Sequence, residues 1–345
     1  MTPKSLIRNI KWRLSKIFLS KEQESWQKAK RINQSFKAGY VIPLSEYSLN
    51  APIKRYDKRR VISVYDGKIR NGGLADRLRG IVSVYEICRE QGLDFKILFT
   101  SPFELTNFLA PNKVDWTITE NEINYNTTIT NLCYIDTLAG NRHEAKKQKQ
   151  WFRKEFKKKY NEFHVRTNAM FSYNSDYSTL FNELFKPTPL LQESIDKQKE
   201  ALGANYISTS FRFMNLLNDF NETVELHDKL NKEEQDTLIA QNLTQLKYLH
   251  KKYPNKRILV NSDSTTFLQA AAEFDYVYII PGNITHIDGT NSSSEYEAYE
   301  KTFLDFFMIA NAERIFLLRT GLMYNSGYPL AASKIYNKPF EKIEF

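Results

Sequence analysis

The sequence contains only two cysteines among its 345 residues, Cys88 and Cys133. Two cysteines cannot build the disulfide framework of a small secreted domain or a four-cysteine zinc site, and such sparing use suits a reducing compartment. Cys88 falls on the apolar side of a helical pattern, which is typical of a small buried side chain. We therefore expect neither a disulfide scaffold nor a cysteine-bound metal.

Long apolar runs are also missing. No stretch reaches the length of about 18 apolar residues that a membrane-spanning helix needs, and the first residues lack the apolar stretch and small-residue cleavage site of a signal peptide. We expect a cytoplasmic protein, with peripheral contact at the inner face of the cell membrane as an open alternative.

Most local catalytic signatures are absent as well. The five histidines form no HExxH pattern, no two aspartates stand two residues apart, and there is no GxSxG elbow. The chain also lacks GxGxxG and the phosphate-binding GxxxxGK[ST]. We expect no metal site and no classical dinucleotide site.

Acidic residues are outnumbered, since the net charge is +9 at pH 7. The excess predicts an anionic partner, such as nucleotide phosphates, an acidic polymer or a membrane surface. No zinc-finger, RRM or helix-turn-helix signature accompanies the charge, so a nucleic-acid-binding protein rests on charge alone and we do not expect a nucleic-acid partner.

What is present begins with the stretch from residue 61 to 100. Val61–Tyr65 alternates like a strand, Asn71-Gly72-Gly73 breaks the pattern, and Phe95–Thr100 reads as a second buried strand. Between them, apolar residues recur at helical spacing: Leu74, Leu78, Ile81, Val82, Tyr85 and Cys88. This order of strand, glycine turn, helix and strand predicts a doubly wound α/β domain.

The glycine turn lies where ligands bind in such folds, at the carboxyl end of a strand. Amide groups at a helix start favour an anion, and Arg77 and Arg79 add positive charge there. The alternative is a plain tight turn without a ligand.

Strands and helices alternate again after residue 205. Four strands are predicted, at 206–213, 257–261, 276–280 and 314–318, with helices at 232–253, 265–274, 295–312 and 329–334. We divide the chain into a basic helical arm (1–59), an N-terminal Rossmann-like, acceptor-side domain (60–200) and a C-terminal Rossmann-like, nucleotide-sugar-binding domain (201–345).

Two basic segments have open interpretations. The arm interleaves apolar and basic residues and suits either an amphipathic helix on an anionic membrane or a helix docked on the protein itself. Arg142–Lys159 reads as a strongly basic helix, which is either a solvated face or a guide for an acidic acceptor.

Polar residues follow several predicted strands of the second domain. Arg212, Asp263 and the loop 319–326 all stand at strand ends. An arginine fork can hold a diphosphate and neutralise its charge as it leaves. Asp263 or Asp305 can accept hydrogen bonds from ribose hydroxyls or a guanine edge, and Ser326 can bind phosphate oxygens.

These residues lie in segments that resemble the three motifs of the GT-B fucosyltransferase superfamily, which groups α1,2-, α1,6- and protein O-fucosyltransferases with bacterial relatives. ISTSFRF resembles a strand ending in His-x-Arg, with Ser210 for the histidine and Arg212 retained. LVNSDS resembles the second motif and contains Asp263, and FLDFFMIANAERIFLLRTGLMYNSGYPLAA resembles the third and contains Asp305, Thr320 and Ser326.

The glycine turn carries a fourth similarity. Residues 72–77, GGLADR, resemble the family's Gly-Gly-x-Gly-Asn-Arg turn. The resemblance covers roughly residues 60–110 and 205–338 and implies an α/β GT-B fold of two facing Rossmann-like domains with parallel sheets. It also implies that Arg212 binds the β-phosphate of a GDP-sugar and that Asp263, Asp305, Thr320 and Ser326 help hold the nucleotide. The turn residues Asn71, Gly72, Gly73, Asp76 and Arg77 would face the sugar and diphosphate.

The resemblance predicts an inverting, metal-independent fucosyltransferase that uses GDP-fucose, or another GDP-sugar, and no cofactor. Its acceptor would be a glycan or lipid-linked glycan in bacterial surface polysaccharide synthesis. The candidate general base is Asp219, seven residues after the strand-end arginine, with Glu222 and Asp76 as further candidates. The alternatives are the same fold with another nucleotide-sugar donor, or a catalytically silent nucleotide- or glycan-binding protein.

Overall fold

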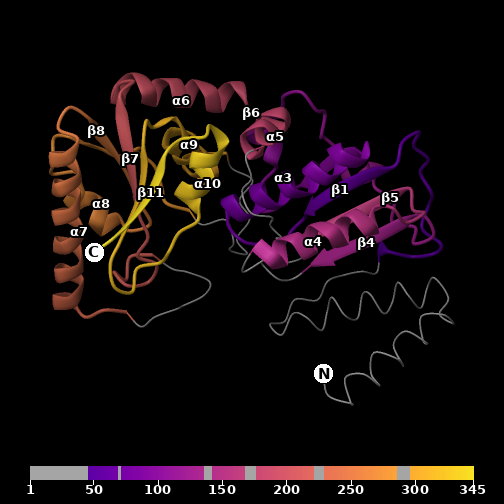
Figure 1. Cartoon of the computed structure of the whole chain (residues 1–345), viewed down its shortest axis with the longest axis horizontal. Coiled ribbons are helices and arrows are strands. Elements are labelled where there is room, and N and C mark those ends of the chain that lie inside the picture. The colour runs from indigo at the N-terminus through magenta and orange to yellow at the C-terminus, as the bar shows by residue number, and fades with distance from the viewer. Residues whose placement is uncertain (1–45, 69–70, 136–141, 168–175, 221–228, 286–295) are drawn as a thin grey trace, which may run out of the picture. The chain divides into compact units, whose positions relative to one another are not determined.

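The computed structural model describes residues 46–68, 71–135, 142–167, 176–220, 229–285 and 296–345. The chain forms two compact units (Figure 1). Unit 1 takes residues 46–71, 83–99 and 115–167, and unit 2 takes residues 72–82, 100–114 and 176–345. Helix α3 (Leu74–Gln91) therefore begins in unit 2 and ends in unit 1. The first 45 residues of the expected basic arm lie outside the described residues.

Unit 1 is built on a parallel sheet of order β2-β1-β5-β4. Its strands are β1 (Arg60–Tyr65), β2 (Asp94–Phe99), β4 (Thr130–Ile135) and β5 (Glu162–Thr167). Helix α3 connects β1 to β2, and α4 (Arg142–Glu155) connects β4 to β5. A 3-10 turn, η3 (Glu120–Glu122), lies in the segment before β4.

The face of the first sheet that carries Arg60, Ile62 and Val64 contains a buried charge network. Glu162, His164 and Arg166 alternate along β5 and point to this same face, because residues two apart in a strand share a side. Glu162 contacts Arg60 Nε at 2.6 Å and His164 Nε2 at 2.7 Å. Every ionised side chain in this group therefore has a charged or hydrogen-bonding partner, which burial requires.

Unit 2 is built on a parallel sheet of order β11-β10-β7-β8-β9. The strands are β7 (Tyr206–Phe211), β8 (Arg257–Ser262), β9 (Val277–Tyr278), β10 (Ile315–Arg319) and β11 (Phe340–Glu344). A separate antiparallel pair joins β3 (Leu109–Pro111) to β6 (Phe185–Pro187). The helical elements of unit 2 are η2 (Leu105–Asn107), α5 (Tyr177–Leu184), α6 (Pro189–Leu202), α7 (Lys232–Lys252), α8 (Thr265–Ala271), α9 (Glu297–Asn311) and α10 (Tyr328–Ile335).

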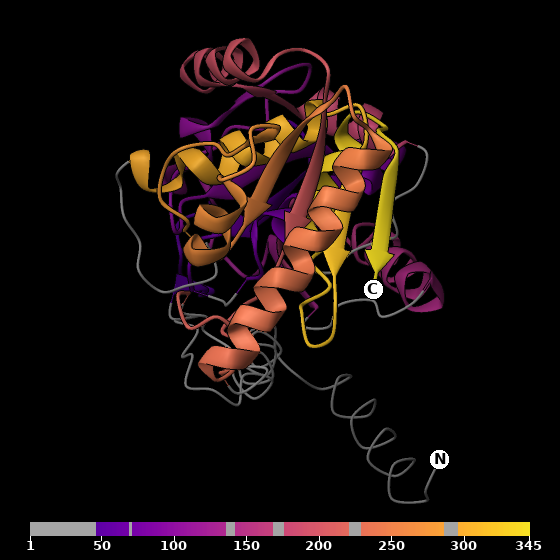
Figure 2. The ribbon, with the colours of Figure 1, turned by 90° about the vertical axis from the view of Figure 1, so that its left-hand side faces the viewer.

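Helices cover both faces of the second sheet. One face packs its alternate residues, such as Ile207 and Phe211 of β7, against α7 and α8, and Figure 2 shows α7 lying across the strands. The opposite face meets α9, where the hydroxyl of Tyr206 donates to the carbonyl of Met308 at 2.6 Å. Side chains of β7 at even positions, including Ser210, therefore point toward the α9 side.

Within the part of the chain that the structure describes, no helix combines the length and the apolar composition needed to cross a bilayer.

Candidate functional site

The predicted strand-end residues of unit 2 meet at one edge of the second sheet. Arg212 follows β7, Asp263 follows β8, and Thr320 follows β10, and the three strands are parallel neighbours. The backbone N–H of Tyr324, in the loop after β10, donates to the carbonyl of Arg212 at 3.0 Å. The carboxyl ends of these strands thus bring together polar residues from three separate segments, as their spacing predicts.

Asp263 is the buried centre of this edge. Its Oδ1 accepts the backbone N–H of Phe213 at 2.8 Å, and its Oδ2 accepts that of Met214 at 2.6 Å. Met214 has a positive φ of 57°, an unfavourable conformation for a residue with a side chain, so these two hydrogen bonds help to hold a strained turn. Burial raises the pKa of Asp263, and the nearby charge of Arg212 opposes that shift. A direct contact of Asp263 with a nucleotide stays a prediction.

Arg212 lies at the start of this turn with a partly open guanidinium. Its Nη1 is 3.3 Å from Asp263 Oδ2, and its side chain keeps 17% of its surface exposed. The ring of Phe220 lies 5.2 Å from the guanidinium carbon, a distance at which a cation and an aromatic face attract. Both contacts hold the guanidinium end of the side chain, which stays partly exposed at the carboxyl edge of the sheet.

Asp305 approaches the same sheet from α9. Both of its carboxylate oxygens are 3.0 Å from Lys301 Nζ, one helical turn earlier. Burial raises the pKa of Asp305, whereas Lys301 and the side chain of Asn261, near the end of β8, lower it. Asp305 was expected from its sequence motif and Lys301 was not, although a lysine four residues before an aspartate in a helical pattern is a signal of an ion pair.

The loop after β10 places the two remaining predicted nucleotide contacts. The Thr320 hydroxyl donates to the carbonyl of Phe345, and Ser326 Oγ accepts the backbone N–H of Tyr328 at 3.3 Å, at the start of α10. Thr320 and Ser326 are both partly exposed. Both hydroxyls therefore already have protein partners, and their contact with a phosphate stays a prediction.

The glycine turn forms the start of α3. The carbonyl of Gly73 accepts the backbone N–H groups of Asp76 and Arg77, each at 3.1 Å. A Cβ on Gly72 would lie 2.6 Å from Asp76 Oδ2, so a side chain here would require the Asp76 carboxylate to move. Asn71, immediately before the turn, is buried.

Arg77 differs from the solvent-facing cation that an anion site suggests. It is 5% exposed, and it donates to the carbonyl of Gly72 at 2.8 Å and to that of Ser101 at 2.7 Å. Arg77 therefore ties the turn to the segment after β2, and its contact with a donor stays a prediction.

The candidate base Asp219 lies against the start of α8. Its Oδ2 accepts from Ser264 Oγ at 2.7 Å and from the backbone N–H of Thr266 at 2.8 Å. Its Oδ1 is buried without a hydrogen-bond partner among the described residues. The other candidate, Glu222, lies outside the described residues.

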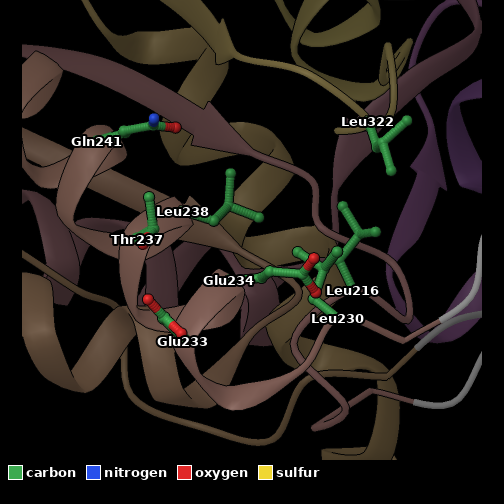
Figure 3. A pocket seen from close by; sticks show the side chains of 8 residues that line it. All are labelled: Leu216, Leu230, Glu233, Glu234, Thr237, Leu238, Gln241 and Leu322. Atoms are coloured by element: carbon green, nitrogen blue, oxygen red, sulfur yellow. The ribbon is translucent and has the colours of Figure 1, made fainter.

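A pocket of about 340 Å³ lies beside the turn after β7 and the loop after β10 in unit 2 (Figure 3). Leu216 comes from the turn after β7 and Leu322 from the loop after β10, while the first half of α7 supplies most of the rest. The lining residues are Leu216, Leu230, Glu233, Glu234, Thr237, Leu238, Gln241 and Leu322. The pocket is apolar at its leucines and acidic at Glu233 and Glu234, so it does not suit a diphosphate.

Among the residues that the structure describes, no group of three or more histidine, cysteine, aspartate or glutamate side chains is arranged to hold a metal ion.

Comparison with solved structures identifies the architecture. NodZ, an α-1,6-fucosyltransferase from Bradyrhizobium solved after soaking with GDP-fucose, matches with a TM-score of 0.50 and 12% identity over 81% of this chain and 93% of NodZ. A variant of FUT1 from Arabidopsis thaliana in complex with GDP matches with a TM-score of 0.50 and 10% identity over 94% of this chain and 79% of FUT1. The apo form of POFUT1 matches with a TM-score of 0.50 and 11% identity over 84% of this chain and 99% of POFUT1.

At sequence identities of 10–12%, these structural similarities establish the fold alone. The chain has the α/β GT-B fold of the fucosyltransferases, with parallel sheets, which confirms the fold that the sequence motifs implied. No protein-family model matches the sequence, and no curated protein matches it.

Proposed function

We propose that this protein is an inverting, metal-independent glycosyltransferase that transfers fucose from GDP-fucose to a hydroxyl group of a glycan acceptor. The observation that carries the proposal is the partly exposed side chain of Arg212, whose guanidinium lies against Asp263 at the carboxyl edge of the second sheet. In GT-B folds of this kind the solved neighbours include structures with GDP and GDP-fucose.

In the proposed reaction, the acceptor hydroxyl attacks the anomeric carbon of fucose and the bond to GDP breaks. Arg212 stabilises the negative charge that develops on the departing diphosphate. A preorganised donor of this kind is typically worth about 3 kcal/mol of transition-state stabilisation. The arginine supplies the positive charge, which is the basis for proposing a reaction without a metal.

The acceptor hydroxyl must lose a proton, and Asp219 is the proposed base. Ser264 and Thr266 hold one carboxylate oxygen of Asp219, so Oδ1 is the oxygen left to accept the proton.

We propose that the acceptor is a glycan or lipid-linked glycan of a bacterial surface polysaccharide, made at the inner face of the cell membrane.

Nucleotide binding tests the proposal first. Thermal stability should rise with GDP and GDP-fucose, unchanged by EDTA, because a ligand that binds only the native state stabilises it. Release of GDP from GDP-fucose in the presence of glycan acceptors should then follow. A shift with UDP or CMP instead would overturn the donor, and no shift with any nucleotide would overturn the transferase.

A further inference from the structure

Lys301 is a buried cation in the middle of α9. It is 8% exposed, and lysine is rarely buried to this degree without a partner. Its Nζ lies 3.0 Å from both oxygens of Asp305 and donates to the carbonyl of Ile280 at 2.9 Å. One ammonium group therefore links the loop after β9 to a carboxylate that the sequence motifs assign to the donor site.

The chain around Lys301 makes room for this side chain. Gly282 has a φ of +124°, which disfavours any residue with a side chain. A Cβ at position 282 would lie 3.2 Å from Cδ and 3.4 Å from Cβ of Lys301. The aliphatic stem of Lys301 thus fills the space that a side chain at position 282 would need, which fixes its path toward Asp305.

Asp305 presents its carboxylate toward the carboxyl edge of the second sheet. It faces Asn261 of β8, and Ser210 of β7 is the register partner of Asn261 and points to the same side. Ser210 Oγ is buried and makes no hydrogen bond within the described residues. The Asp305 side chain is 16% exposed, and each oxygen can accept a further hydrogen bond beyond that from Lys301.

We propose that Lys301 is a positioning residue: it holds Asp305 ionised and oriented so that Asp305 accepts hydrogen bonds from the donor nucleotide. This inference rests on the proposed function, because it concerns the same donor site. The chemical partner of Asp305 is a hydroxyl or N–H donor, such as a ribose hydroxyl or the edge of guanine, since an ionised carboxylate only accepts.

The titratable groups around Asp305 come from two helices. Lys301 is on its own helix, and Tyr328 faces it from α10, while Asn261 on β8 is neutral. Burial raises the pKa of Asp305 and Lys301 is the main group that lowers it again. Burial and the charge of Asp305 raise the pKa of Tyr328, so its phenol stays neutral. Removing the lysine charge should therefore move Asp305 toward protonation at higher pH.

The first experiment measures GDP affinity by calorimetry from pH 5.5 to 8.5 for the wild type and for Lys301→Met, Lys301→Arg and Asp305→Asn. Below the pKa of a required carboxylate, affinity falls about tenfold per pH unit. We expect the Lys301→Met protein to lose affinity at a pH at least one unit higher than the wild type. Lys301→Arg, which keeps the charge, should follow the wild type, and Asp305→Asn should bind weakly at every pH.

A structural role alone predicts a different result. Lys301→Met would then be less stable but, once folded, would bind GDP with the wild-type pH profile, and that profile would overturn the proposal. Lys301→Gln provides a second neutral variant if the methionine protein does not fold. Circular dichroism at each pH confirms that only folded protein is compared.

A second measurement needs no nucleotide. Carbon-13 labelling of the aspartate carboxyl groups follows the titration of Asp305 directly by NMR, and Asp305→Asn assigns its signal. The signal should titrate at higher pH in Lys301→Met, and an unchanged titration would overturn the proposal. If the wild type bound no nucleotide, the proposed function and the donor role of Asp305 would fail, while this titration would still decide whether Lys301 controls Asp305.

Discussion

Arg212 Nη1 lies 3.3 Å from Asp263 Oδ2, and the same carboxylate accepts the backbone N–H groups of Phe213 and Met214. One buried side chain therefore fixes both the guanidinium and the turn that follows it. Arg212 directly follows β7 and Asp263 directly follows β8. The position of the Arg212 guanidinium therefore depends on the pairing of these two strands.

Asp263→Asn should destabilise the protein and weaken nucleotide binding together. In the wild type, each carboxylate oxygen of Asp263 accepts one buried N–H group, whereas the asparagine amide has a single acceptor oxygen. One N–H group would therefore lose its partner, and an unsatisfied buried donor costs about 1–3 kcal/mol. Urea unfolding and GDP titration measure the two effects. Asp275→Asn, at an exposed position of the same unit, is the matched control and should change neither.

Arg212→Ala should reduce turnover of GDP-fucose by about 10²- to 10³-fold, the typical loss when one transition-state donor is removed. Arg212→Lys should recover only part of it, because lysine cannot present the planar two-point fork. Steady-state release of GDP provides the measurement. Arg257→Ala removes the same charge from the opposite end of the neighbouring strand and should keep wild-type turnover. Equal loss in both variants would contradict a specific role for Arg212.

Gly72→Ala should destabilise the glycine turn by about 1 kcal/mol, the low end of the range for overpacking, because the Asp76 carboxylate is partly exposed and can move. The new methyl group would lie 2.6 Å from Asp76 Oδ2, and displacing that carboxylate separates it from Arg79, now 3.6 Å away. In the double variant with Asp76→Ala the cost should shrink, which thermal unfolding of the four proteins can measure as a coupling energy. Strict additivity would show that the clash is not the cause.

Unit 1 should lose stability as the pH falls below neutrality. Burial lowers the pKa of His164 from 6.5, so the unfolded chain binds more protons below that pH and gains stability relative to the folded chain. The loss is at most about 1.4 kcal/mol per pH unit for one proton. Burial alone would raise the pKa of Glu162, but the hydrogen bond and charge of His164 outweigh it with help from Asn124 and Arg60, so the pKa is lowered. The stability that ionised Glu162 contributes to the folded protein is therefore lost only at still lower pH, below 4.5.

Urea unfolding followed by tryptophan fluorescence at pH 7.5 and 5.5 tests this expectation. His164→Gln cannot titrate and should show a smaller difference between the two pH values. Tyr47→Phe removes the 2.7 Å hydrogen bond to His164 Nδ1 but keeps the imidazole, so it should be less stable with the difference retained. An undiminished difference in His164→Gln would assign the pH dependence to other groups.

Phe108→Ala should be among the most destabilising single changes in unit 2, at about 3–5 kcal/mol. The ring is fully buried and stacks on Phe303 with centroids 4.3 Å apart and on Tyr296 at 4.8 Å. Thermal unfolding measures the cost. Tyr248→Ala, with 61% of the tyrosine exposed, removes an aromatic ring from the surface of the same unit and should stay within about 0.5 kcal/mol of wild type.

Much of the fold could be predicted because hydrophobic periodicity and turn residues agreed. The series β1, α3 and β2, and the alternation from β7 to α10, appear where the pattern indicated them. Four of the described strands, β3, β5, β6 and β11, were not predicted. β5 reads EFHVRT, and its polar residues are buried only because partners from other segments neutralise them. β11 reads FEKIE, a mostly polar edge strand that resembles a loop.

The site residues also fall into a part that the sequence predicts and a part that it does not. Strand ends predicted that Arg212 and Asp263 would meet, since parallel neighbours end at one edge of a sheet. The hydrogen bonds from the backbone N–H groups of Phe213 and Met214 to Asp263 could not be predicted, because they depend on the positive φ of Met214. The spacing of Lys301 and Asp305 indicates an ion pair, but the burial of Lys301 could not be predicted, because it depends on Ile280 and Gly282 from another segment.

The division of the chain between the two units also constrains the order in which they can form during synthesis. All four strands of the first sheet are complete by Thr167, whereas Phe108 meets Tyr296 and Phe303 only after α9 has been made. A nascent chain therefore carries the exposed aromatic surface of residues 100–114 while most of its partner is still untranslated, a state prone to aggregation. No single cut in the chain releases either unit whole, so expressing the C-terminal half alone leaves Phe303 of α9 without its aromatic partners Phe103 and Phe108.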